Sequence, residues 1–182
     1  MLSDTPLRKG ELALAYKATE DGWSALDFHR RCDYKGPCVV VARTQAGVVF
    51  GGFNPVGWMS ADDYTSAWGA FLFSFPDSTG TPAALPKIGS SDAAVFDFAR
   101  GGPQWGVDGL VIGPPQAPVM GGMAGPDSPT NGAGDVRTAK SRLGLSYAAL
   151  PDGGTSLLGA GAATAVLAEV EAYYAPAIAA MY

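Results

Sequence analysis

The residues of this chain that are best suited to chemistry lie close together, between His29 and Cys38. His29 is the only histidine in the sequence. Hydrolytic mechanisms commonly need a histidine beside a nucleophile, and zinc sites commonly need several histidines or cysteines. His29 lies near the end of a predicted helix, where an imidazole can meet the last helix carbonyls. We therefore interpret His29 as a structural residue and expect no metal site.

Cys32 and Cys38 are the only cysteines, and two are too few for a disulfide scaffold. Arg30, Arg31 and Lys35 flank them, and cationic neighbours lower a thiol pKa and favour the reactive thiolate. This pattern makes Cys32, in the polar turn, a candidate for reaction with peroxide, with Cys38 as the resolving thiol. The redox interpretation requires Cys32 to be exposed. Ordinary structural thiols are the favoured interpretation, because Cys38 opens an apolar strand.

The remaining polar residues form no catalytic constellation. The chain contains no G-x-S-x-G elbow, no G-x-x-x-x-G-K-[ST] loop and no G-x-G-x-x-G opening a helix after a strand. The carboxylates are scattered, and no pair has a spacing that requires general acid–base work. We therefore expect a protein that is not an enzyme and has no cofactor.

An acidic pair and two glycine pairs also stand out in the sequence. Glu169 and Glu171 share one face of a predicted strand, so they fit a solvated face or a charged docking edge. One of them could also be the partner of Arg100 or Arg137. The paired glycines at 51–52 and 101–102 lack the downstream lysine or acid of a nucleotide site. We interpret them as tight turns, or as bulges where strands cross closely.

The composition predicts a folded protein with many turns. Hydrophobic residues make up 47 % and charged residues 16 %, as in globular domains. The 25 glycines and 14 prolines suit positions that need a positive or fixed φ. A net charge of −5 argues against a nucleic-acid-binding face. No apolar run could span a bilayer and no secretory segment is found, so we expect an intracellular protein, cytoplasmic or organellar and not secreted.

The elements that would position these residues are mostly short strands. Ser24 with Asp27 is a capping-box pattern that predicts a helix over 25–31. Ser60 with Asp63 is a second such pattern and predicts a short helix through about Trp68, with Asp62 and Asp63 as its amino-terminal charges. Strands are predicted over 11–18, 38–43, 48–53, 71–75, 94–98, 110–112, 155–158 and 165–173, with an edge segment at 85–88. A helix is the competing interpretation of 165–173.

Residues 113–134 are almost entirely glycine, proline and small residues, and they predict a long irregular loop. Loops of this length are usually functional or mobile. Within it, the apolar stretch 114–123 holds Met120 and Met123 and suits a partner surface. A helical turn is expected within a short C-terminal tail, 174–182. With no repeat and no long linker, the chain is expected to be one domain, 1–182.

Six blocks of sequence occur in a specific order and spacing. They are ALAYKATEDGWS (13–24), FHRRCDYKGPCVVVA (28–42), VVFGGF (48–53), FLFSF (71–75), GGPQWGVDGLVI (101–112) and EVEAY (169–173). In these blocks the chain resembles the TLDc domain family over nearly its whole length. The tract through Ser146 and the tail after Tyr173 resemble the plant and green-algal branch of that family.

The resemblance implies an α+β, β-rich fold in which two antiparallel sheets form a sandwich with short peripheral helices. It implies a link to protection against oxidative damage. In several members it also implies binding to the vacuolar-type proton-pumping ATPase, whose assembly the domain regulates. No catalytic centre is established for the family, so we predict a non-catalytic regulatory module. Two alternatives stay open: a structural subunit of a ciliary or organellar assembly, and a thiol-dependent antioxidant that uses Cys32 and Cys38.

The partner is expected to be a protein and not a nucleic acid, and the chain is expected to have no transmembrane segment. The predicted partner-binding residues lie in the basic turn, in the irregular loop and at the acidic strand edge: Arg31, Lys35, Met120, Met123, Glu169 and Glu171.

Overall fold

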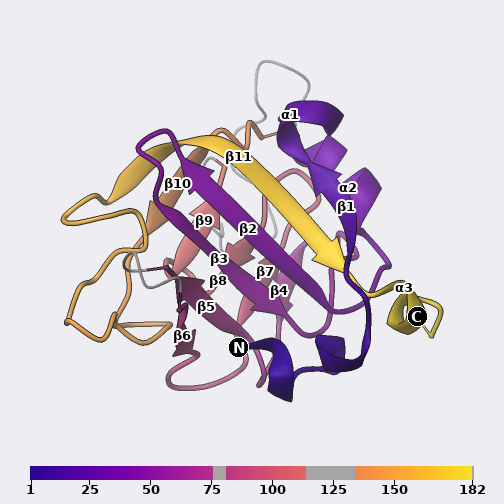
Figure 1. Ribbon diagram of the computed structural model, residues 1–182, viewed down its shortest axis with the longest axis horizontal. Coiled ribbons are helices and arrows are strands. Elements are labelled where there is room, and N and C mark those ends of the chain that lie inside the picture. Colours follow the sequence, from indigo (N-terminus) through magenta and orange to yellow (C-terminus); the bar gives the residue numbers. More distant parts are fainter. Residues whose placement is uncertain (76–80, 114–133, 182) are drawn as a thin grey trace.

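The computed structural model describes residues 1–75, 81–113 and 134–181, apart from the side chain of Lys9. Strands dominate it, and the helices are short and peripheral (Figure 1). The helical elements are the 3-10 turns η1 (Leu2–Asp4) and η2 (Pro6–Lys9) and the α-helices α1 (Ala18–Asp21), α2 (Ala25–Cys32) and α3 (Pro176–Ala179). The strands are β1 (Ala13–Lys17), β2 (Cys38–Thr44), β3 (Val49–Asn54), β4 (Asp63–Thr65), β5 (Phe71–Ser74), β6 (Ala83–Pro86), β7 (Val95–Asp97), β8 (Gln104–Trp105), β9 (Leu110–Ile112), β10 (Thr138–Ser141) and β11 (Thr164–Tyr174).

The strands pair antiparallel in the order β4-β7-β8-β9-β10-β11-β2-β3-β5-β6, and β1 also pairs with β11. The long strand β11 belongs to both halves of this arrangement. Its first residues pair with β10, and its later residues pair with β2 and β1. A register shift between Leu167 and Glu169 interrupts β11 between these two regions, and such a bulge bends a strand. Figure 1 shows β7, β8 and β9 behind β2 and β3, which confirms the β-rich α+β sandwich.

Trp105 fills the space between the two layers. Its ring packs on the backbone of Gly52 in β3, where an added Cβ would lie 2.5 Å from the indole Cε2. Its Nε1 donates a hydrogen bond to the carbonyl oxygen of Phe53 at 3.0 Å. Trp58 meets Trp105 edge-to-face, with ring centroids 5.6 Å apart. The glycine pair at 51–52 lies within the regular β2–β3 ladder and forms neither a tight turn nor a bulge, but Gly52 does mark a close contact between the layers.

A second, smaller apolar cluster lies on the other side of the sheet that contains β2 and β3. It is formed by Val39, Phe53 and Phe73 from the strands, with Leu7 and Ala175. Leu7 comes from η2, and Ile178 of α3 packs against the same cluster. The two ends of the described chain therefore cover this face. The predicted C-terminal helical turn is confirmed as α3.

Helix α2 begins as its capping box predicted. The Ser24 Oγ accepts a hydrogen bond from the Asp27 N–H at 3.1 Å, and an Asp27 carboxylate oxygen accepts from the Ser24 N–H at 3.3 Å. The helix buries Phe28, His29 and Cys32. The hairpin of β2 and β3, the strand β5 and the edge strand β6 also lie where the sequence predicted them.

The helix predicted from the second capping-box pattern was wrong. Residues 60–68 form no helix, and Asp63–Thr65 is the strand β4, paired with β7. Ser60 and Asp62 both have positive φ values, 57° and 56°, which a regular helix excludes. The Asp62 carboxylate accepts a hydrogen bond from the Ala99 N–H instead of capping a helix. Tertiary contacts to residues more than 30 positions away therefore override the local signal.

Further expectations for elements were corrected in detail. Residues 155–158 form turns and irregular structure, not a strand. Strands β8 and β10 and the helical turns η1, η2 and α1 were not predicted. In β1, Leu14 and Tyr16 are two residues apart and would share one face of a regular strand, but Tyr16 is buried and Leu14 is 46 % exposed. The register shifts between Leu14 and Tyr16, and this bulge turns the two side chains to different faces.

Within the described residues, none of the helices combines the length and apolarity needed to cross a membrane. Most of the predicted loop 113–134 lies outside the described residues, as does Tyr182 of the predicted tail. The expectation of one domain stays a prediction.

Candidate functional site

Helix α1 lies between two of the predicted partner-binding residues. On one side, the guanidinium of Arg31 in α2 forms an ion pair with the Asp21 carboxylate of α1. On the other side, the Glu169 carboxylate of β11 accepts hydrogen bonds from the Thr19 N–H at 3.2 Å and from the Thr19 hydroxyl. The short helix thus joins α2 to β11. Arg31 lies within α2 and not in a turn, but its side chain is 53 % exposed.

The charges around α1 form one continuous surface. Lys17 of β1 forms an ion pair with Glu20 at 2.8 Å, and this contact raises the pKa of the Lys17 ammonium. Glu169 and Glu171 also lie close enough to Lys17 to favour its charged form. We call this surface the α1 face and define it as Lys17, Thr19, Glu20, Asp21, Arg31, Glu169 and Glu171. It joins β1, α1, α2 and β11.

The second glutamate of the acidic edge is held by its neighbour on β11. The Tyr173 hydroxyl donates a hydrogen bond to the Glu171 carboxylate at 2.6 Å. Burial and this carboxylate together raise the pKa of Tyr173 to about 12. Neither Arg100 nor Arg137 is placed as the partner of the acidic edge: Arg137 pairs with Asp135 at 2.9 Å, and Arg100 lies over the ring of Phe98.

Lys35, the other residue of the predicted basic turn, contacts the end of the same strand. Its ammonium lies 4.8 Å from the centre of the Tyr174 ring, a cation–π contact. The side chain is half-buried. The structure therefore places Arg31, Lys35, Glu169 and Glu171 around the C-terminal half of β11, as one neighbourhood. Met120 and Met123 lie outside the described residues.

His29 sits in a buried polar network below this neighbourhood. Its Nδ1 lies 2.8 Å from the Asp33 carboxylate, and its Nε2 lies 3.0 Å from the carbonyl oxygen of Gly101. The Asp33 carboxylate and the Gly101 carbonyl oxygen are both acceptors, an arrangement that favours the protonated ring. Burial opposes the charged form, but the hydrogen bond and charge of Asp33, with Asp97, outweigh it and raise the pKa of His29.

The same network fixes the strained segment that follows β3. The hydroxyl of Ser60 donates to the second oxygen of Asp33. The N–H groups of Met59 and Ala61 donate to Asp97 at 2.9 Å and 3.2 Å. Asp97 is 2 % exposed, and burial raises the pKa of its carboxyl. The Ser60 hydroxyl donates to Asp33, and the contacts of this network hold residues 59–61 against α2 and β7. His29 thus has a structural environment, but its carbonyl partner is Gly101 and not the end of its own helix.

The two cysteines are both buried, each 1 % exposed. Cys32 is the last residue of α2, not part of a polar turn. Burial raises the pKa of the Cys32 thiol well above its ordinary value, and the adjacent Cys38 thiol adds to this effect. Lys35 acts in the opposite direction, but more weakly. A protonated, buried thiol is a poor nucleophile, so the exposure that the peroxide-reactive interpretation requires is missing.

A cleft of about 840 Å³ lies between the turn after β2 and residues 150–161, and its described lining includes none of Arg31, Cys32, Lys35, Cys38, Glu169 and Glu171. Asp152 is the single titratable residue in its lining, and its carboxylate accepts a hydrogen bond from the Gly154 N–H at 2.8 Å. The rest of the lining is glycine, apolar residues and hydroxyls. The described residues of this cleft therefore hold no pair of groups for acid–base or nucleophilic chemistry.

Several residues of the site were not predicted. Thr19 and Asp21 follow the predicted strand 11–18 and were not singled out, although the acidic pair at 20–21 was a sign of an ion pair with the basic end of α2. Asp33 and Asp97 were counted among scattered carboxylates. Asp97 could have been singled out, because a carboxylate inside the apolar run AVFDF is a sign of a buried, hydrogen-bonded acid.

The model of the TLDc domain family matches residues 2–121 of the chain. This range includes every element from η1 to β9, and it stops before β10 and β11. No curated protein is similar enough in sequence to count as a match.

Proposed function

The chain belongs to the TLDc domain family, and we propose that it is a non-catalytic, regulatory protein-binding module linked to protection against oxidative damage. The observation that carries the proposal is the α1 face, where ionic and hydroxyl groups from four elements are held in place by their own contacts. Preorganised charged groups recognise a partner without paying the full entropy of ordering at the moment of binding. The thiols, by contrast, lie in the core.

The partner that the family suggests is the vacuolar-type proton-pumping ATPase. We propose that its complementary charges meet Arg31, Glu20 and the edge formed by Glu169 and Glu171. Ion pairs at the rim of an interface set its specificity and association rate more than its affinity. Regulation would then be exerted by occupancy of the α1 face and not by turnover of a substrate.

The α1 face is tested with Arg31→Ala and Glu20→Ala, separately and together. Both side chains project into solvent, at 53 % and 67 % exposure, so the fold should remain. We expect the double variant to bind the purified proton pump about tenfold more weakly than the wild type, as for the loss of two charged contacts. Binding is measured by cosedimentation with pump-containing vesicles. Arg142→Ala, at another exposed arginine (70 %), is the matched control and should bind normally.

Two outcomes would contradict separate parts of the proposal. If the double variant binds like the wild type, the α1 face is not the contact surface. If the wild type does not bind the pump, that partner is wrong, and affinity purification from the native cell then tests the alternative of a structural subunit. A stable stoichiometric assembly resistant to salt would favour that alternative.

A further inference from the structure

Trp68 is by far the most exposed of the four tryptophans, at 84 %. Trp58 and Trp105 are buried at 1 % and 0 %, and Arg137 lies over the ring of Trp23. A tryptophan offers the largest apolar surface of any side chain, so such exposure marks a candidate interaction site. Trp68 lies between β4 and β5, far in sequence from the residues of the α1 face.

The backbone on both sides of Trp68 is anchored, so the point at which this side chain leaves the surface is defined. Ala67 and Ala70, on either side of the tryptophan, are 3 % and 2 % exposed. The Ala70 N–H donates to the carbonyl oxygen of Ala67 at 3.2 Å, and the Ala67 N–H donates to that of Ser91 at 3.3 Å. The ring is thus mounted on a turn whose two ends are anchored in the core.

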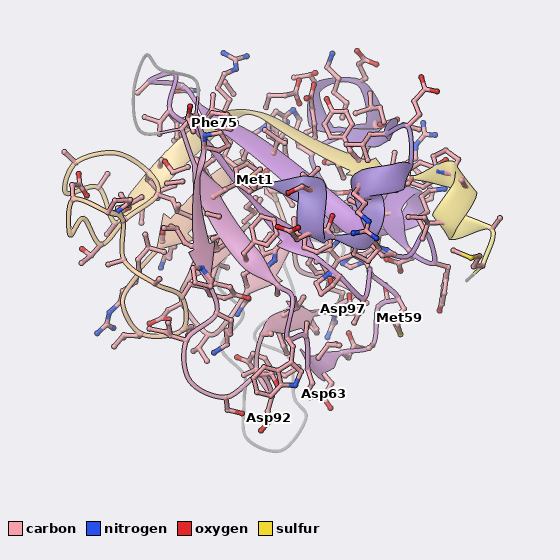
Figure 2. All side chains as sticks on the ribbon, turned by 60° about the horizontal axis from the view of Figure 1, so that its bottom comes forward. Met1, Met59, Asp63, Phe75, Asp92 and Asp97 are labelled. Carbon is pink, nitrogen blue, oxygen red and sulfur yellow. The ribbon has the colours of Figure 1, made fainter. Side chains whose placement is uncertain are left out.

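Carboxylates lie on either side of this turn. The hydroxyl of Ser66 lies 3.4 Å from the Asp92 carboxylate, which places Asp92 next to the Trp68 turn. Asp63 is exposed on β4, which is the edge strand of its layer. Figure 2 shows Asp63 and Asp92 at the same end of the molecule.

The chain segments around Trp68 contain one basic residue, Lys87. Residues 44–86 and 88–99 contain five aspartates and no lysine, arginine or histidine. Lys87, which separates the two segments, directs its ammonium to the carbonyl oxygen of Ile88 at 2.8 Å and lies near the ring of Tyr147. Asp62, Asp63 and Asp92 are exposed. These two segments therefore bring acidic side chains and no basic ones to the surface around Trp68, and Arg100, which follows them, lies over the ring of Phe98.

We propose that this surface, the Trp68 strip, binds an extended arginine- or lysine-rich segment of a partner protein. We define the strip as Tyr34, Met59, Asp63, Trp68 and Asp92. Tyr34 continues it beyond Met59, because the Tyr34 hydroxyl donates to the Met59 carbonyl oxygen at 3.3 Å and the ring is 72 % exposed. The proposal goes beyond the proposed function, since it names a second surface with its own partner chemistry.

Charge and aromatic character together select this occupant. Tryptophan is the best cation–π acceptor, and arginine is its most frequent partner. Carboxylates accept paired hydrogen bonds from a guanidinium. An extended segment of nine residues spans about 30 Å, long enough to contact both an aromatic ring and carboxylates on this surface. A hydrophobic helix would leave the carboxylates unpaired, and an acidic segment would be repelled.

The test is a titration with a nine-residue peptide of alternating arginine and glycine, followed by fluorescence of the exposed tryptophan. The matched control peptide has glutamate in place of each arginine. We expect the arginine peptide to shift the tryptophan emission and to bind more weakly as salt is raised. Trp68→Ala should weaken binding by about fivefold and Trp68→Phe by less, since phenylalanine keeps part of the cation–π attraction. Binding of the variants is measured by isothermal titration calorimetry, which does not need the tryptophan signal.

The carboxylates are tested separately with the pair Asp63→Asn and Asp92→Asn, expected to weaken binding by about tenfold. Leu145→Ala, at a well-exposed apolar residue (56 %), is the control and should bind like the wild type. The proposal is overturned if the arginine peptide does not bind, if the glutamate peptide binds as well, or if the Trp68 and carboxylate variants bind normally. Arg31→Ala with Glu20→Ala should leave peptide binding unchanged, which separates this result from a failure of the α1 face.

Discussion

The two residues best suited to chemistry, His29 and Cys32, are both withdrawn from solvent, and burial affects them in different ways. Cys32 has no counter-charge that outweighs burial, so its thiol stays protonated. His29 has the Asp33 carboxylate at 2.8 Å and a carbonyl oxygen on its other nitrogen, and these contacts raise the pKa of its ring despite burial. Both residues are buried in α2. They differ in their neighbours, because His29 faces two hydrogen-bond acceptors and Cys32 lies beside the Cys38 thiol.

His29 makes stability depend on pH in the neutral range. Its folded-state pKa is raised above 6.5, so its contribution is complete below about pH 6.5 and is lost as the pH rises through the folded-state value. The free energy of unfolding should therefore fall from pH 6 to 8, by at most about 1.4 kcal/mol per pH unit. His29→Gln should remove this slope and cost about 3 kcal/mol at pH 6, because Asp33 loses its buried cation.

Urea unfolding at several pH values checks this expectation. The chain has one histidine, so a change of stability between pH 6 and 8 that is lost in His29→Gln can be assigned to this residue. The variant keeps the thiols and the terminal amine and is therefore its own control for their titration. A stability that rises with pH in the wild type, or an equal slope in His29→Gln, would show that the ring is neutral in the folded protein.

At the scale of elements, the pairing of β3 with its neighbours depends on two adjacent glycines that serve opposite faces. Gly52 leaves room for the ring of Trp105 in the space between the layers. Gly51 leaves room on the other side, against the ring of Phe73 and the backbone of Val40. Side chains alternate along a strand, so a pair of glycines clears both faces at one level. The β2–β3 hairpin can therefore pack closely against residues on both of its faces.

Gly52→Ala should destabilise the fold by about 1–3 kcal/mol, the usual cost of overpacking a core. The new methyl group would overlap the Trp105 indole, 2.5 Å away. Gly69→Ala is the matched control, because its added Cβ would be 3.8 Å from Pro55, an ordinary contact. It should change stability by less than about 0.5 kcal/mol. Thermal unfolding of both variants compares them, and equal losses would mean that Trp105 moves aside without cost.

At the scale of the whole molecule, β11 determines whether the layers stay together. It pairs with β1, β2 and β10, and it comes from the last part of the chain. The family match ends at residue 121, before this strand. The matched residues alone would leave β2 with one neighbour and β1 without its partner β11. Completion of the sandwich therefore depends on sequence beyond the matched range.

A chain ending at residue 121 should fail to fold, because β10 and β11 are removed and the edge of β2 is opened. A chain ending at residue 175 keeps every strand and loses only α3, whose Ile178 packs on the smaller cluster. It should fold with a modest loss of stability. Dispersion of amide signals in NMR spectra distinguishes the two. Dispersed signals from the shorter chain would show that β11 is not needed.

Much of the fold follows from local sequence. The capping box at Ser24 and Asp27, the β-branched run of β2 and the alternation of β11 each have a physical cause within a few residues. The errors share a different cause. Ser60 and Asp63 have the same spacing as the first capping box, but Asp97 accepts from the N–H groups of Met59 and Ala61, and Asp33 accepts from the Ser60 hydroxyl. Contacts across 27 or more positions cannot be found in a local pattern.

The sequence by itself determined that this is a β-rich protein of the TLDc type with no catalytic motif, since hydrophobic periodicity, turn residues and block order are properties of neighbours along the chain. The tertiary structure alone decided which polar residues meet. It placed α1 between Arg31 and Glu169, buried Cys32, raised the pKa of His29 and left Trp68 in solvent. The physical reason is that burial and pairing depend on residues brought together by the fold from distant positions in the chain.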